Sequence, residues 1–152
     1  MNKIVKKYLF DLEFKAGEKN RRNIIKLLPG IEGNVSILDL GCNDGSWTLQ
    51  LGKRYRNPSL HGVEIVDENA KKAVKNGVAV KSFDLNGPFD YENESFDIVH
   101  CNQVIEYLYD TDSFVSEVYR VLKPNGVFIV SSVSLSSWHN IFSLLLGYQP
   151  FD

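Results

Sequence analysis

The sequence predicts an α/β fold in which a parallel sheet carries helices on both faces. Short segments rich in Ile, Val and Leu alternate five times with segments of helical character along the 152 residues. That alternation is typical of parallel strands joined by crossover helices. The run Ile98-Val99 in one of these segments has no polar face, which favours a strand covered on both sides. Each crossover should be right-handed.

Residues 1–34 are predicted to form helices that pack on the core, and residues 35–152 to form the main domain. Apolar residues at helical spacing predict a helix over residues 3–14. Gly17 interrupts this pattern, so a second helix is expected from about Glu18 to Leu28.

The main domain is expected to contain five strands separated by helices and turns. The expected strands cover residues 35–40, 60–65, 78–83, 96–101 and 127–133. The expected helical segments cover residues 45–55, 67–75, 103–109, 112–122 and 136–146. Asp67 is well placed to cap the second of these helices, because its carboxylate can accept from exposed backbone N–H groups. Lys123-Pro124-Asn125-Gly126 is predicted to be a turn.

The stretch Ile37–Ser46 leads from the first strand through a glycine turn into a helix. Gly41 and Gly45 let the backbone turn sharply and approach a ligand closely, since neither carries a Cβ. Such a strand–turn–helix commonly holds a nucleotide-like ligand at the carboxyl end of a parallel sheet. The dinucleotide fingerprint G-x-G-x-x-G would need glycine where the chain has Asn43 and Ser46. A nicotinamide-dependent oxidoreductase is therefore disfavoured.

Five short motifs follow one another along roughly residues 35–134. They are ILDLGCNDG at 37–45, HGVEI at 61–65, FDL at 83–85, FDIVHCNQVIEYL at 96–108 and EVYRVLKPNG at 117–126. In this order they resemble the motifs of class I S-adenosylmethionine-dependent methyltransferases, close to types 11 and 12. The resemblance implies a Rossmann-like, doubly wound sheet of five parallel strands in the order 3-2-1-4-5. It also implies S-adenosylmethionine as the cofactor, with S-adenosylhomocysteine as its product.

The resemblance also assigns roles in cofactor binding. The residues concerned are Asp39, Gly41, Cys42, Asn43, Gly45, Glu64, Ile65, Asp84, Leu85, Asn102 and Gln103. The turn would pack against the methionine part of the cofactor, while Glu64 would accept from both ribose hydroxyls. Asp84 would accept from the adenine amino group beside the Leu85 backbone N–H. Asp39 would either orient the turn or meet the cofactor's ammonium group.

The resemblance carries over no catalytic residue. Methyl transfer from a sulfonium is an in-line displacement, so positioning and desolvation can supply much of the catalysis. A general base is needed only if the acceptor arrives protonated. The residues expected near the pocket mouth are Glu106, Tyr107, Tyr109, Trp138 and His139, and Tyr8 could close over the cofactor. A small molecule is the expected methyl acceptor.

The chain departs from the family pattern at three places. Asn43 replaces the usual middle glycine, although asparagine tolerates a left-handed backbone better than most residues. Tyr107 stands where many relatives have histidine. The family's final antiparallel hairpin is missing, so we expect either a truncated chain or a short form covered by a partner. The alternative function is therefore an inactive or partner-dependent S-adenosylmethionine-binding module. An open sheet edge or an apolar C-terminal helix predicts a homodimer.

Composition narrows the function classes further. The net charge of −2 gives no argument for nucleic acid binding, and no segment is long enough for a membrane span. Cys42 and Cys101 form neither a disulfide framework nor a zinc spacing, which favours a cytoplasmic setting. We expect no metal site, because His61, His100 and His139 do not form a ligand set and each reads as structural or exposed.

Overall fold

The computed structural model describes residues 3–132, 141, 144 and 145 of the chain. The chain divides into two units, one formed by residues 1–28 with 133–152 and the other by residues 29–132. The helix expected over residues 136–146 falls largely outside the described residues. Among the described residues, no helix combines the length and the apolar character that crossing a bilayer requires.

Helix α1 (Lys3–Leu27) is one continuous helix of 25 residues. The expectation of two helices separated at Gly17 was therefore wrong. A Cβ added at Gly17 would meet nothing within 4 Å, so no close packing accounts for the glycine. Glycine inside a helix costs only about 0.5–1 kcal/mol relative to alanine, which is too little to end a helix of this length.

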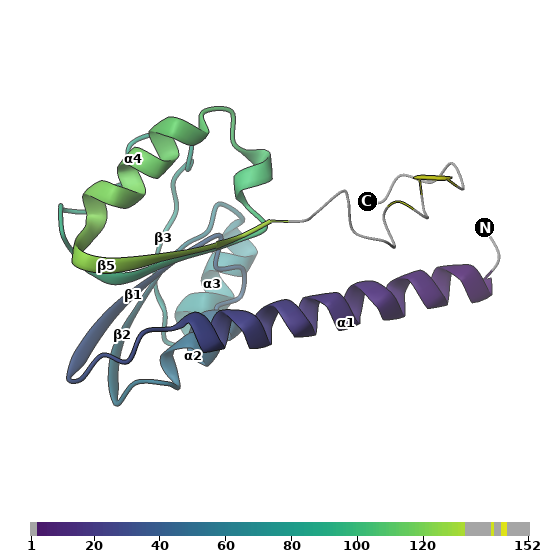
Figure 1. The fold of residues 1–152 in the computed structure, drawn as a ribbon. Helices are drawn as coiled ribbons and strands as arrows, with labels where there is room; N and C mark the ends of the chain where they lie inside the picture. Colours follow the sequence, from purple (N-terminus) through teal and green to yellow (C-terminus); the bar gives the residue numbers. More distant parts are fainter. Residues whose placement is uncertain (1–2, 133–140, 142–143, 146–152) are drawn as a thin grey trace. The chain divides into compact units, whose positions relative to one another are not determined.

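The unit of residues 29–132 is built on a five-stranded parallel sheet (Figure 1). Its strands are β1 (Asn34–Leu40), β2 (Asn57–Val63), β3 (Ala79–Lys81), β4 (Phe96–Asn102) and β5 (Leu122–Ser131). Their order is β3-β2-β1-β4-β5, and each pair is parallel. The predicted fold class and strand order are confirmed.

Helices cover both faces of this sheet. They are α2 (Ser46–Gly52), α3 (Asp67–Lys75) and α4 (Thr111–Val121), and a short 3-10 helix, η1 (Ile105–Tyr107), follows β4. Phe114 of α4 belongs to the same buried cluster as Leu38 and Leu40 of β1. Ala73 of α3 packs in a separate cluster with Cys42. Asp39 alternates with Leu38 and Leu40 along β1, and it contacts α2 on the opposite face from α4.

Several boundaries differ from the expected ones. Strand β2 begins at Asn57 and contains Pro58 near its start, where a proline is tolerated, so Glu64 follows the strand. Strand β3 has only three residues. The residue that caps α3 is Val66, so the expectation that Asp67 forms the cap was wrong. Asp67 lies in the first turn instead, where a carboxylate still interacts favourably with the helix dipole.

The turn expected at residues 123–126 lies inside β5. The pairing of β5 with β4 shifts register there, because Phe96 pairs with Leu122 while Ile98 pairs with Val127. Asn125 has a φ of 64° in this interruption. The proline and glycine thus mark a bulge-like break within the strand, which sequence alone did not distinguish from a turn before it.

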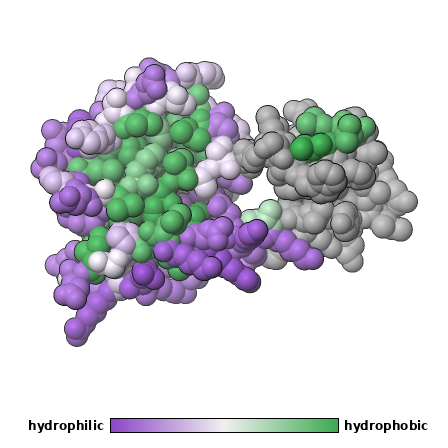
Figure 2. Space-filling view, viewed as in Figure 1, coloured by the Kyte–Doolittle hydropathy of each residue, from purple (hydrophilic) through white to green (hydrophobic). Residues whose placement is uncertain are grey.

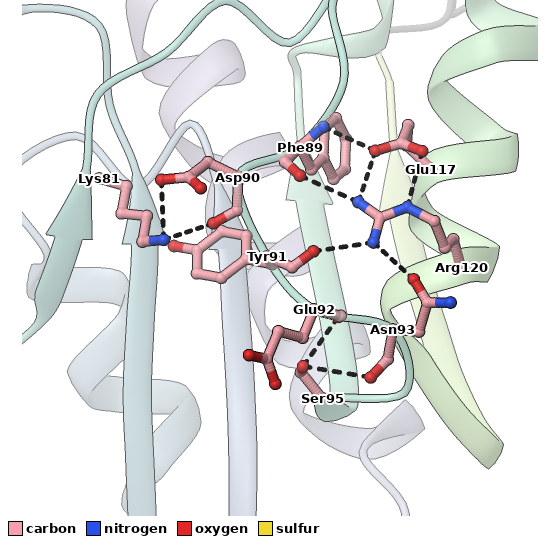
Figure 3. Close-up of polar contacts among 9 residues, drawn as sticks. All are labelled: Lys81, Phe89, Asp90, Tyr91, Glu92, Asn93, Ser95, Glu117 and Arg120. Atoms are coloured by element: carbon pink, nitrogen blue, oxygen red, sulfur yellow. Dashed lines mark hydrogen bonds and ion pairs between the residues drawn. The ribbon is translucent and has the colours of Figure 1, made fainter.

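Arg120 of α4 holds the loop between β3 and β4 (Figure 3). Two of its N–H groups donate to the Glu117 carboxylate at 2.8 and 2.7 Å. The other bonds reach the carbonyl oxygens of Phe89 and Tyr91 and Oδ1 of Asn93, at 2.7–2.9 Å. Glu117 also accepts from the Phe89 backbone N–H at 2.6 Å. All five guanidinium donors are therefore used, and most of them fix a loop that has no regular secondary structure.

Candidate cofactor-binding site

The predicted site residues lie at the carboxyl edge of the sheet. Strand order runs outward from β1 through β2 to β3, and then restarts on the other side of β1 with β4. The loops that follow β1 and β4 therefore diverge at a topological switch point, which is where open α/β sheets bind ligands. The turn 41–45 follows β1, and Glu64 and Ile65 follow β2. Asn102 ends β4, with Gln103 next to it.

The turn after β1 depends on three residues in the left-handed region. Gly41, Asn43 and Gly45 have φ values of 78°, 50° and 75°. A Cβ on Gly41 would lie 2.5 Å from a methyl of Val104, and one on Gly45 would lie 3.1 Å from the backbone of Ala73. The two glycines are therefore needed for both conformation and space. The backbone N–H groups of residues 41 and 42 donate to the carbonyl oxygen at the end of β2, at 2.9 and 3.0 Å.

The left-handed backbone at Asn43 gives a testable difference between two substitutions. Asn43→Gly should change the free energy of unfolding by less than about 0.5 kcal/mol, while Asn43→Ala should lower it by about 1 kcal/mol, because alanine is strained at positive φ. Urea unfolding of both variants measures this difference. An Asn43→Ala variant as stable as Asn43→Gly would contradict it. Calorimetry with S-adenosylhomocysteine should show that Asn43→Gly retains binding.

Glu64 connects the loop after β2 with the turn after β1. Its carboxylate is nearly buried, with 8% of the residue exposed. Oε2 accepts from the backbone N–H of Asn43 at 2.9 Å, and Oε1 accepts from that of Val66 at 2.8 Å. Each carboxylate oxygen can accept a second hydrogen bond, so both can still bind hydroxyl groups. The neighbouring side chain of Ile65 is 65% exposed and offers an apolar surface beside the acid.

Asp84 and Leu85 follow β3 and differ in exposure. The Asp84 side chain is exposed, and its Oδ1 accepts from both the backbone and side-chain N–H groups of Asn86 at 2.9 Å. These hydrogen bonds lower the pKa of the Asp84 carboxyl, so it is ionised at neutral pH. Leu85 places its side chain in the buried cluster beneath α4.

Asn102 and Gln103 tie the end of β4 to β5. Asn102 accepts a hydrogen bond from the Ser131 hydroxyl through Oδ1. The Gln103 backbone N–H donates to the Ser131 carbonyl at 2.8 Å, and Gln103 has a φ of 54°. Gln103 is exposed at this edge.

Asp39 lies beneath the turn and is 2% exposed. Its Oδ1 lies 2.7 Å from Nδ1 of His100, and its Oδ2 accepts from the Thr48 hydroxyl at 2.6 Å. Of its two expected roles, this geometry favours orientation of the turn. The partners His100 and Thr48 were missed as members of a network. The sequence did contain one sign of this network, since Asp39 and His100 are polar residues inside two apolar strands.

Cys42 is buried against the sheet within this turn. Burial, together with the nearby carboxylates of Asp39 and Glu64, raises the pKa of its thiol to about 12. The thiol therefore stays protonated at neutral pH and acts as a small buried side chain.

The residues expected near the pocket mouth are only partly described. Tyr107 and Tyr109 are exposed, at 76% and 95%, and Glu106 lies with Tyr107 in η1. Trp138 and His139 lie outside the described residues. Tyr8 belongs to α1, in the other unit. Within the described ranges, no three His, Cys, Asp or Glu side chains gather closely enough to hold a metal ion.

Comparison with known proteins identifies the family. The family model described as "Methyltransferase domain" matches residues 38–130, which is more than half of the chain. The chain belongs to this methyltransferase family. A bovine mitochondrial ubiquinone biosynthesis O-methyltransferase (Bos taurus) is 32% identical to it over 128 residues, covering 76% of the chain and 33% of the relative. The chain thus spans about a third of that relative's length.

Solved structures of methyltransferases share the fold of this methyltransferase domain. A Haemonchus contortus phosphoethanolamine N-methyltransferase 2 in complex with S-adenosyl-L-methionine gives a TM-score of 0.67 at 22% identity, covering 88% of this chain and 34% of that one. A Haloferax volcanii methyltransferase, solved with the Trm112 methyltransferase activator, gives 0.66 at 20% identity and covers 82% and 58%.

The residues of the methyltransferase domain fit S-adenosylmethionine, the cofactor that the sequence resemblance implies. A nearly buried acid with two available oxygens matches two ribose hydroxyls. The glycines at 41 and 45, both at positive φ, keep the turn tight at the switch point, where open α/β sheets bind ligands.

Proposed function

We propose that this chain binds S-adenosylmethionine and transfers its methyl group to a small-molecule acceptor. The observation that carries the proposal is the placement of the Glu64 carboxylate, which accepts from the turn at Asn43 and keeps acceptor capacity on both oxygens. The named O-methyltransferase relative and the phosphoethanolamine methyltransferase neighbour support a small-molecule acceptor. The free, buried cysteines support a reducing, cytoplasmic setting.

The residue roles follow from position at the carboxyl edge. Glu64 binds both ribose hydroxyls, and Ile65 gives the adenine ring an apolar surface. Asp84 accepts from the adenine amino group, with the Leu85 backbone N–H beside it. The turn 41–45 faces the methionine part, and Asn102 and Gln103 line that part from the side of β4.

The chemistry needs little from individual side chains. Bound S-adenosylmethionine supplies an electrophilic methyl group on a positively charged sulfur. Glu64 and the turn 41–45 would hold the cofactor, whose carbon–sulfur bond would break, with its electron pair kept by sulfur, as the acceptor's lone pair bonds to the methyl carbon. The protein contributes orientation and exclusion of water. A protonated acceptor would also require a base, and Glu106, Tyr107 and Tyr109 are the candidates within the described residues.

A thermal-shift comparison tests the cofactor assignment. S-adenosylhomocysteine should raise the Tm, because a ligand that binds only the folded state stabilises it by about 2.7 kcal/mol at 100 times its Kd. NAD at the same concentration should leave the Tm unchanged. A shift with NAD and none with S-adenosylhomocysteine would overturn the proposal. Methyl transfer from labelled S-adenosylmethionine to a panel of small hydroxyl, amine and carboxyl compounds then tests activity.

A second candidate function is a cofactor-binding module that needs a partner. It is favoured by the neighbour that was solved with a methyltransferase activator. Under this alternative, S-adenosylhomocysteine still shifts the Tm, but no acceptor in the panel is methylated by the chain alone.

We also propose that the chain forms a homodimer through β5. In the described part of the sheet, β5 pairs on one side only. Figure 2 shows hydrophobic residues gathered over the part of this unit where Figure 1 places α4 and β5, and Val115 and Val130 are exposed on these elements. Light scattering should give a mass twice that of one chain, and Val130→Lys should reduce it to one chain. A single-chain mass for the unmodified protein at every concentration would contradict this.

A further inference from the structure

His100 occupies the centre of the sheet without any solvent contact. It lies in β4, is 0% exposed, and pairs in register with Asp39 of β1. Its Nδ1 lies 2.7 Å from Oδ1 of Asp39. Its Nε2 lies 3.4 Å from the indole Nε1 of Trp47 in α2. One imidazole therefore links two adjacent strands and a helix.

The partners fix the direction of both hydrogen bonds. The Trp47 indole N–H can only donate, so Nε2 of His100 accepts from it. Because Nε2 accepts, the ring proton is on Nδ1, which donates to Oδ1 of Asp39. The network thus assigns a neutral imidazole protonated at Nδ1. The second oxygen of Asp39 accepts from the Thr48 hydroxyl, so every donor in the network faces an acceptor.

These bonds act at both ends of the turn 41–45. Asp39 lies two residues before the turn, and Trp47 and Thr48 lie just after it in the first residues of α2. The turn itself has three residues at positive φ, and Gly45 caps α2 without a side-chain hydrogen bond. A fully satisfied buried network restricts the groups it joins. The network therefore helps to set the relative placement of the two ends of the turn, together with the bonds from the turn to β2 and to Glu64.

We propose that His100 is a positioning residue for the cofactor turn, which it holds by donating to Asp39 and accepting from Trp47. This inference rests on the proposed function, because the turn is the expected site of the methionine part. His100 does not touch the cofactor, and it acts through the backbone of Gly41, Asn43 and Gly45.

Three variants separate positioning from stability. His100→Phe removes both hydrogen bonds, while His100→Asn keeps a side-chain N–H donor for Asp39. Val99→Ala is the matched control, since Val99 is equally buried in β4 but belongs to the cluster on the α4 face. By calorimetry at a temperature where all variants are folded, S-adenosylhomocysteine should bind about tenfold more weakly to His100→Phe, the equivalent of one buried hydrogen bond. His100→Asn should recover most of this loss, and Val99→Ala should retain the affinity while lowering the Tm.

NMR of the unliganded protein supplies a readout that does not depend on the cofactor. The His100 ring nitrogens should show the neutral form protonated at Nδ1, and the Trp47 indole signal is assigned by comparison with Trp138→Phe, since the chain has two tryptophans. His100→Phe should shift the amide signals of Gly41 and Gly45. Equal affinity losses in His100→Phe and Val99→Ala, or a His100 ring protonated at Nε2 alone, would overturn the proposal.

These experiments distinguish a failure of the proposed function from a failure of the positioning role of His100. If the unmodified chain does not bind S-adenosylhomocysteine, the proposed function fails, and the amide shifts at Gly41 and Gly45 still decide whether His100 positions the turn. If His100→Phe does not fold, the ring protonation in the unmodified chain and the affinity of His100→Asn remain decisive. In that case, an affinity of His100→Asn about tenfold below that of Val99→Ala would count against positioning, because His100→Asn keeps a donor for Asp39.

Discussion

Replacement of Glu64 by alanine should lower the affinity for S-adenosylhomocysteine by about 100-fold or more. The expected contacts are two hydrogen bonds from ribose hydroxyls to one ionised carboxylate, and such bonds contribute about 1.5–3 kcal/mol each. Alanine also removes the acceptor for the Asn43 backbone N–H, so the turn loses its bond to the loop after β2. Together, the two lost ribose hydrogen bonds exceed the change of about 2.7 kcal/mol in binding free energy that corresponds to a 100-fold change in Kd. Isothermal calorimetry measures the change.

Two control variants show whether the carboxylate itself is responsible. Glu68→Ala removes an exposed acid in the first turn of α3 and should leave the affinity unchanged. Glu64→Gln keeps one acceptor oxygen but places an amide N–H₂ on the other side, where it faces the N–H of either Asn43 or Val66. We expect it to bind between the wild type and Glu64→Ala. Unchanged affinity in Glu64→Ala would remove the ribose assignment, whatever cofactor the chain binds.

The fold was predictable because buried parallel strands leave a simple signal. The apolar runs around Ile37 and Ile98 can only be buried on both faces, and alternation with helices then restricts the topology to a few possibilities. Boundaries were less predictable, because packing outweighs local preferences. Gly17 did not end α1, and the proline and glycine of residues 123–126 did not delay β5. At Gly17 the local cost is about 1 kcal/mol or less, which the rest of the helix offsets. At residues 123–126 the strand continues through a break in its pairing with β4.

The apolar runs predicted roughly where the strands end, and the resemblance assigned the residues that follow those ends to the cofactor. The hydrogen bonds among them were not predictable. Asp39 had two possible roles until its contact with His100 was known, and that contact depends on the register between β1 and β4. Register is a property of two strands distant in sequence, so neither strand alone specifies it.

The loop between β3 and β4 is stabilised by contacts that were likewise not predictable from the sequence. Its backbone carbonyl groups lie away from any strand partner, and Arg120 supplies donors to two of them (Figure 3). Glu117 completes the arrangement with two bonds to the guanidinium and one from the Phe89 N–H. Since this loop directly follows Asp84 and Leu85, an ordered loop also keeps the expected adenine contacts in place.

Arg120→Met should therefore lower the free energy of unfolding by about 3 kcal/mol. Methionine keeps much of the apolar stem but removes all five hydrogen bonds of the guanidinium, which lie in a half-buried site. The Phe89 carbonyl keeps the Tyr91 N–H and the Glu117 carboxylate keeps the Phe89 N–H, so the cost is that of the lost bonds, about 0.5–1.5 kcal/mol each. The matched control is Arg21→Met in α1. Arg21 also pairs with a glutamate three residues earlier, but at the surface, so its loss should cost about 0.5 kcal/mol or less. Urea unfolding followed by circular dichroism compares the two.

The pH dependence of the stability difference between the wild type and Arg120→Met shows whether the charged hydrogen bonds of Arg120 cause it. The hydrogen bonds from Arg120 hold the pKa of the Glu117 carboxyl below its ordinary value of 4.5. A carboxyl whose pKa is lowered in the folded state stabilises the protein fully above its unfolded pKa, and that contribution is lost as the pH falls through the folded value. The gap in stability between the wild type and Arg120→Met should thus be constant near neutral pH and narrow below about 4.5. A gap that does not change with acidification would attribute the loss to packing of the arginine stem instead of its charged hydrogen bonds.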